Sequence, residues 1–182
     1  MRRDQVVLGL GLPSLTAVGG VVPMAIADVP GVDVAGLTFD AGSRNSPVLL
    51  KVGSRAAGGR TVGRSGQPTA LQDVFFRIGG PHAGKATVSL EVNTDGTLLD
   101  DIWAWRADHG EGVGWTKNTA RTGVVVNGDD VVATGLFVEH YQGYNVVWNG
   151  ERGRTIFFQN EPAVRRAEPG RVAAPRAGRQ PG

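Results

Sequence analysis

The chain has 182 residues, of which 41% are hydrophobic and 20% charged, so it is long and apolar enough to bury the core of one globular domain. Its formal net charge is +2, but the basic excess lies in residues 163–182, and the rest of the chain is slightly acidic. Charge therefore does not indicate a nucleic-acid-binding protein. The absence of cysteine excludes a disulfide framework, a thiolate nucleophile and a cysteine metal site.

The first 27 residues allow two interpretations. Two arginines, an apolar stretch over 6–24 and small residues before Asp28 are typical of a secretory signal peptide. Glycines and Pro13 interrupt that stretch, and this pattern favours short strands separated by turns. We therefore predict that these residues form the first part of the fold. The same interruptions argue against a transmembrane helix.

Farther along, the apolar residues come in short β-branched and aromatic runs bounded by Gly, Asn and Asp, which is typical of strands. Two of these runs match residue by residue over a long span, and the matching residues, such as Val92 and Val126, are always the same number of positions apart in the sequence. In all, one short strand sequence, called the phrase below, recurs five times. We expect the central residue of each copy to point inward, and these residues are Leu37, Val74, Ile102, Leu136 and Ile156.

A repeated strand predicts an all-β fold, a right-handed single-stranded parallel β-helix of the pectate-lyase-like kind with about four to five coils. A β-sandwich is the alternative, because it also uses many short strands, but it has no reason to repeat one phrase. We expect the coils to occupy 1–162, with an exposed loop at 53–68 and a disordered basic tail at 163–182. The loop lacks the spacing of a Walker phosphate-binding motif.

Two copies of the phrase end on an acidic residue, and strand alternation places both Glu139 and Glu161 on the outward face. Stacking Leu136 on Ile156 puts Glu139 over Gln159 and leaves Glu161 one coil and two residues away. The expected Cα separation is about 8 Å. Inverting glycosidases hold their two carboxyl groups about 6.5–9.5 Å apart, so that one protonates the leaving oxygen and the other activates a water.

Three motifs carry a resemblance to a known family: the run from Trp103 to His109, the pair Glu139-His140 and the triplet from Gln159 to Glu161. In order and spacing they resemble motifs in the second β-helix of glycoside hydrolase family 55, the exo-β-1,3-glucanases. The resemblance is close over about 69–161 and loose over 5–55. Because family members are several times longer, we expect this chain to be a fragment.

The resemblance implies a secreted, inverting hydrolase of O-glycosyl bonds that acts on a β-1,3-glucan polysaccharide or oligosaccharide. It implies that Glu161 is the general acid and that Glu139 positions and activates the attacking water. It implies no cofactor, no metal ion, no nucleic acid and no membrane as partner, and it leaves the oligomeric state open. A non-catalytic glycan-binding or structural β-helix module remains the alternative function.

Further side chains are candidate sugar contacts. The two tryptophans share the outer face and can either stack on a pyranose ring or pack under a long loop. Asp108, which precedes His109, can either bind sugar hydroxyls or form an ordinary turn. The full set of candidates is Trp103, Trp105, Asp108, Tyr141 and Gln159.

Two other groups of polar residues are less suited to chemistry. The three histidines, His82, His109 and His140, do not have the spacing of a metal cluster, and we expect His140 to point inward as a hydrogen-bonded core residue. Asp100 and Asp101 are adjacent on a strand, so we expect them to face opposite ways and not to act together.

Overall fold

The structure, a computed structural model, describes residues 1–54 and 67–163, and within these ranges all regular elements are strands. The described residues include no helix that is long and apolar enough to cross a membrane. The strands are β1 (Val6–Leu8), β2 (Ser14–Ala17), β3 (Met24–Ile26), β4 (Asp33–Ala41), β5 (Ser46–Val52), β6 (Ala70–Ile78), β7 (Ala86–Val92), β8 (Leu98–Arg106), β9 (Ala120–Val126), β10 (Val132–Glu139), β11 (Tyr144–Trp148) and β12 (Arg154–Glu161).

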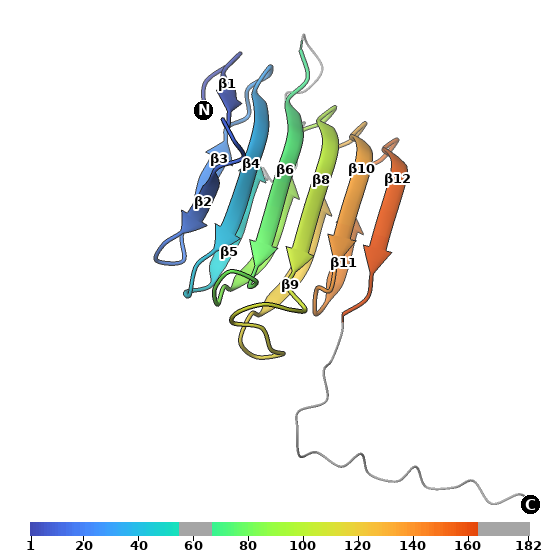
Figure 1. The fold of residues 1–182 in the computed structure, drawn as a ribbon. Helices are drawn as coiled ribbons and strands as arrows, with labels where there is room; N and C mark the ends of the chain where they lie inside the picture. Colours follow the sequence, from blue (N-terminus) through green and yellow to red (C-terminus); the bar gives the residue numbers. More distant parts are fainter. Residues whose placement is uncertain (55–66, 164–182) are drawn as a thin grey trace, which may run out of the picture.

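The strands form two stacked sheets. One sheet has the order β4-β6-β8-β10-β12, with β1 and β2 both beside β4, and the other has the order β3-β5-β7-β9-β11. In Figure 1 the front strands run downward and the chain returns behind them while it advances from left to right, which is a right-handed coil. This is the hand that nearly all parallel crossovers adopt.

Every pairing between these strands is parallel, so the fold is a parallel β-helix, as predicted. A sandwich would require antiparallel hairpins. In the part of the chain that the structure describes, the antiparallel contacts are limited to one isolated bridge between Gly80 and Glu111. The sandwich alternative is therefore wrong.

Residues 1–27 form the first coil, as predicted. Val6 to Leu8 pair with the start of β4, Ser14 to Ala17 pair with its end, and Met24 to Ile26 pair with β5. The predicted loop and tail cannot be described in the same way. Apart from residues 53, 54, 67, 68 and 163, both segments lie outside the described residues.

The long strands of the first sheet each bend at one residue with a positive φ. In β8 this residue is Asp101, and the bend leaves Leu99 and Ile102 both buried while Asp100 and Asp101 between them are both exposed. The prediction that the two aspartates face opposite ways is therefore wrong, because it assumed an unbroken pleat. The equivalent residues, with φ between 49° and 68°, are Gly36, Asp73, Asp101, Gly135 and Phe157.

A column of aliphatic side chains runs through the core. Leu37, Val74, Ile102 and Leu136 are register partners on successive coils, and all four are buried, as predicted. The fifth residue was predicted wrongly. Ile156 pairs with the outward-facing Thr134 and is 57% exposed, whereas Phe158 is the residue that stacks on Leu136.

A ladder of asparagines fixes the register at the ends of the strands in the second sheet. Asn127 donates its side-chain amide to Asn93 at 2.8 Å, and Asn149 donates to Asn127 at 2.7 Å. Asn93 in turn donates to the carbonyl oxygen of Gly53 at 3.1 Å. The same turn is thus repeated from coil to coil, which keeps successive coils, and the side chains on their outer face, in line.

Candidate functional site

Glu139 and Glu161 lie side by side at the ends of β10 and β12. They are direct register partners on the same outer face of neighbouring coils, and both are partly exposed. Their common face was predicted correctly, but the displacement by two residues was wrong because Phe158, rather than Ile156, lies over Leu136. Partners on adjacent parallel strands are about 4.8 Å apart at Cα, not 8 Å.

Gln159 connects the two carboxylates. Its Nε2 donates to Oε1 of Glu161 at 2.7 Å and lies 3.4 Å from Oε1 of Glu139, so its amide lies between them as expected, although its register partner is Phe137. The Oε1 atoms of the two carboxylates are therefore no more than about 6 Å apart.

The tryptophans extend this surface onto β8. Trp105 is the register partner of Glu139, on the outer face where both tryptophans were expected, and Trp103 donates its indole N–H to Oε2 of Glu139 at 3.1 Å. The two indoles stack with centroids 5.2 Å apart. Trp105 is 8% exposed, with the His109 ring 5.0 Å from its own and Gly80 against its edge. Of the two alternatives for Trp105, the structure therefore favours packing beneath loops.

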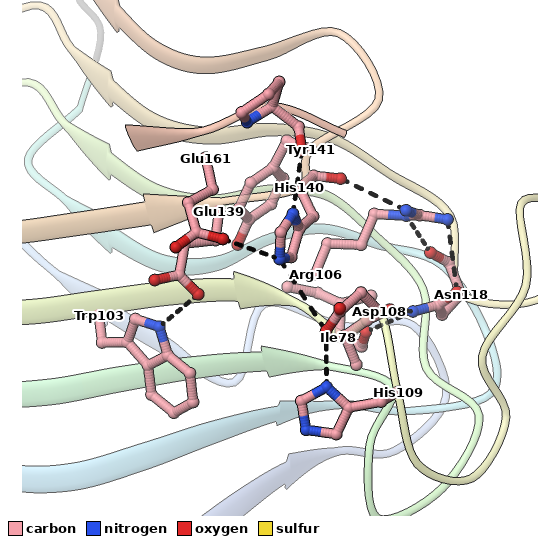
Figure 2. A network of polar contacts seen from close by, with 12 residues as sticks. Ile78, Trp103, Arg106, Asp108, His109, Asn118, Glu139, His140, Tyr141 and Glu161 are labelled. Atoms are coloured by element: carbon pink, nitrogen blue, oxygen red, sulfur yellow. Dashed lines mark hydrogen bonds and ion pairs between the residues drawn. The ribbon is translucent and has the colours of Figure 1, made fainter. Parts of the chain in front are cut away.

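A chain of polar contacts leads from Glu161 to the loop after β8, as Figure 2 shows. Nε2 of His140 lies 3.6 Å from Oε2 of Glu161 and 3.9 Å from Oδ1 of Asp108, and the same Asp108 oxygen lies 2.7 Å from Nδ1 of His109. Burial alone would raise the pKa of Asp108, but the hydrogen bonds from His109 and from its own backbone, with the nearby imidazoles, hold that pKa below its ordinary value.

His140 is buried and hydrogen-bonded, as predicted, with Nδ1 3.0 Å from the carbonyl oxygen of Pro162. The prediction that it points into the core is wrong, because its ring lies beside Glu161 and Asp108 on the outer side of the coil. Its contact with Glu161 was not predicted. Its φ of 65° reverses the alternation of the chain after β10. As a result Tyr141 does not share the outer face with Glu139, and that prediction is wrong.

Tyr141 is instead 2% exposed, and its hydroxyl forms a 2.7 Å hydrogen bond with the hydroxyl of Ser89. Burial raises the pKa of this phenol well above its ordinary value, although the bond with Ser89 opposes the shift. The side chain is therefore part of the packed interior and offers no surface to a sugar.

Arg106 is a site residue that the sequence did not reveal. It is 2% exposed and donates to the backbone carbonyl oxygens of Asn118 at 2.8 Å, Gly114 at 3.2 Å and His140 at 3.3 Å. Its guanidinium also lies 5.3 Å from the centre of the Trp115 ring. Burial lowers the pKa of Arg106. The only available signal was an arginine inside an apolar strand pattern, which can equally be an outward-facing residue.

Asn118 completes the anchoring of that loop. It is fully buried, and its side-chain amide donates to the carbonyl oxygens of Ile78 at 2.9 Å and Ala107 at 2.7 Å. Together with Arg106 it ties the segment over 107–119 to β6 and to the end of β10 (Figure 2).

Within the described ranges, no three His, Asp or Glu side chains are grouped so that they could hold a metal ion.

Comparison with known proteins agrees with the geometry. The family model of the LAM55 pectate lyase-like domain matches residues 1–161. The chain belongs to this family. Over 162 residues this LAM55 domain is 55% identical to an exo-beta-1,3-glucanase of Streptomyces sp. (strain SirexAA-E / ActE), a match that covers 89% of the chain and 26% of the relative.

Solved structures give the same result. The structure of sacteLam55A from Streptomyces sp. SirexAA-E superposes with a TM-score of 0.85 at 54% identity, over 90% of the LAM55 domain described here and 29% of the other chain. A variant of sacteLam55A in complex with glucose gives a TM-score of 0.82 at 54% identity, over 88% and 29%. The chain thus spans less than a third of the length of each of these relatives.

Proposed function

We propose that this chain carries the hydrolytic carboxyl pair of a β-1,3-glucan hydrolase. The observation that supports the proposal best is the register pairing of Glu139 with Glu161 on one outer face, in a chain similar over most of its length to an exo-beta-1,3-glucanase. The reaction is hydrolysis of an O-glycosyl bond, and the substrate is a β-1,3-linked polysaccharide or oligosaccharide.

In this proposal Glu161 protonates the glycosidic oxygen, and Glu139 positions and activates the attacking water. The N–H donors around Glu139 support its role. Trp103 and Gln159 both direct N–H groups at its oxygens, and an ionised carboxylate can only accept hydrogen bonds. Glu161 receives one such bond from Gln159 and has the His140 ring beside its other oxygen.

Inversion of the anomeric centre requires a water to fit between the sugar and the base, so the space between the two carboxyl groups must be open when the substrate is bound. Gln159 now occupies the space between them. Its 3.4 Å contact with Glu139 is the longer and weaker of its two, so this is the contact that we expect an entering sugar to break.

The test is glucose release from a laminarin-type β-1,3-glucan. Glu161→Gln and Glu139→Gln should each lower the rate by about 100-fold or more, since general acid–base groups contribute on that scale. Glu151→Gln is the matched control, because its side chain is 80% exposed in the turn before β12 and lies outside the site. If release by Glu161→Gln equals release by the control, Glu161 is not the acid.

A non-catalytic glycan-binding or structural module is the second candidate. It is favoured by the 47% exposure of the Glu161 side chain, since the proton donors of glycosidases are usually held in apolar surroundings. Sedimentation with insoluble β-1,3-glucan distinguishes the two functions. Binding that is unchanged in Glu161→Gln, without glucose release by the unaltered chain, would favour the binding module.

We also propose that the protein acts outside the cell, because a polysaccharide substrate is found there. Detection of the chain in the culture medium of cells that express its complete gene would support this location. Retention of all of it inside intact cells would contradict it.

A further inference from the structure

The His140 ring has a defined orientation. Its Nδ1 lies 3.0 Å from the carbonyl oxygen of Pro162, and a carbonyl oxygen can only accept a hydrogen bond. Nδ1 therefore carries a hydrogen in every protonation state that keeps this bond. The proton that can come and go is the one on Nε2.

Nε2 faces two carboxylates. Oε2 of Glu161 lies 3.6 Å away, and Oδ1 of Asp108 lies 3.9 Å away. A neutral ring with hydrogen on Nδ1 would present a lone pair to two anions, which is unfavourable in a site where the ring is only 7% exposed. The arrangement is favourable if Nε2 carries a proton, so that the ring is paired with the two carboxylates as an ion pair at distances longer than a hydrogen bond.

Glu161 is the partner best suited to share that proton. The pKa of Asp108 is lowered by its bond with His109, so Asp108 stays ionised and holds positive charge near Nε2. Glu161 has one oxygen bound by Gln159 and the other directed at the ring. Figure 2 shows the imidazole between these two carboxyl groups.

We propose that His140 and Glu161 exchange a single proton when the two side chains approach to hydrogen-bond distance, and that His140 is the positioning residue that supplies it to the acid. The transfer breaks the Nε2–H bond and forms an O–H bond on Oε2, so that an imidazolium and a carboxylate become a neutral imidazole and a carboxylic acid. Nothing else is consumed. The catalytic meaning of this proton rests on the proposed function, whereas its location does not.

Substrate entry provides a reason for the proton to move. An ion pair is favoured where water reaches it, and the Glu161 side chain is 47% exposed in the free chain. A sugar ring placed against Glu161 removes that water, and loss of water favours the neutral form of both partners. The acid would then become protonated when the substrate arrives.

The surroundings of His140 determine its charge. Arg106 from β8 contacts the backbone oxygen of His140 and leaves the ring free. The other titratable groups around it are on the loop after β8, on β10, on the segment that follows β10 and on β12. They are Asp108, His109, Glu139, Tyr141 and Glu161.

Nitrogen-15 NMR of the histidine side chains tests the exchanged proton directly, because the chain has only three histidines. At neutral pH we expect hydrogen on both nitrogens of His140. Glu161→Gln removes one of the two carboxylates and leaves Asp108, so it should lower the pH at which His140 loses its Nε2 proton, while Glu151→Gln should leave that pH unchanged. A neutral ring in the unaltered chain, or a spectrum that does not respond to Glu161→Gln, would overturn the proposal.

The pH dependence of glucose release tests the consequence. His140→Gln should lower kcat by at least about 10-fold, with little change in KM, and should move the upper pH limit of activity to lower pH. His82→Gln is the control, since that ring contacts the backbone oxygen of Ala41 and is not one of the residues in the chain of polar contacts from Glu161. A loss of equal size at every pH would show a merely structural role and contradict the proposal.

The NMR measurement and the glucose-release assay together distinguish this inference from the proposed function. If the unaltered chain releases no glucose but Glu161→Gln still lowers the pH at which His140 loses its Nε2 proton, the proton exchange is correct and the hydrolytic assignment is wrong. If glucose is released and depends on Glu161, but His140 is neutral throughout, the hydrolytic assignment is correct and the proton exchange is wrong.

Discussion

Ile102 and Ile156 occupy the same position in two copies of the repeated sequence, but Ile102 faces the core and Ile156 faces outward. They therefore form a matched pair for testing the register. Ile102 is fully buried between Val74 and Leu136, whereas Ile156 is 57% exposed. Ile102→Ala removes three carbons, worth about 2.4 kcal/mol of transfer free energy at about 0.8 kcal/mol each. The cavity left behind brings the expected cost to about 3–4 kcal/mol.

Urea denaturation followed by circular dichroism measures this difference. With a slope of about 2 kcal/mol per molar urea, Ile102→Ala should lower the midpoint by roughly 1.5–2 M. Ile156→Ala should change the free energy of unfolding by no more than about 0.5 kcal/mol, as is usual for exposed positions. Equal losses in the two variants would mean that Ile156 also faces the core, and the observed register of β12 would be wrong.

Two further predictions concern polar side chains that hydrogen-bond to another coil. Because burial raises the pKa of Tyr141, the unfolded chain loses a proton near pH 10 that the folded chain keeps, so stability should fall by about 1.4 kcal/mol per pH unit above that value. Denaturation at alkaline pH should show this slope reduced in Tyr141→Phe and retained in Tyr144→Phe, which alters an exposed ring. Asn127→Ala, in the middle of the asparagine ladder, should lower the free energy of unfolding by about 1–3 kcal/mol. Thermal denaturation of both variants should show a larger loss for Asn127→Ala than for Asn149→Ala at the end of the ladder.

The sequence was sufficient to predict the solenoid and the aliphatic column, because copies of a repeated strand stack with their equivalent residues in register. It failed at β12, where the left-handed Phe157 occupies a place that glycine or aspartate takes on the earlier coils. Such a backbone state is rare for a phenylalanine and leaves no signal in the hydrophobic pattern. The error moved Glu161 two residues along the strand relative to Glu139.

The same cause explains the misplacement of Tyr141, since the left-handed His140 reverses the alternation on which the prediction depended. Arg106 and Asn118 escaped notice for a different reason. Their bonds join segments that come together only in the coiled chain, and their partners are backbone carbonyl oxygens, which no side-chain pattern reveals. The common outer face of Glu139 and Glu161 was predicted correctly because both end a repeated phrase and their face follows from the repeat itself.

The proposed role of Glu161 as proton donor is tested most directly by comparing two substrates with different leaving groups. Laminaribiose needs its glycosidic oxygen to be protonated, whereas a dinitrophenyl β-glucoside has a leaving group that departs without a proton. Glu161→Gln should lower kcat/KM on laminaribiose by about 100-fold or more and on the dinitrophenyl glucoside by much less. An equal loss on both substrates, or no loss on either, would contradict the assignment of Glu161 as the acid.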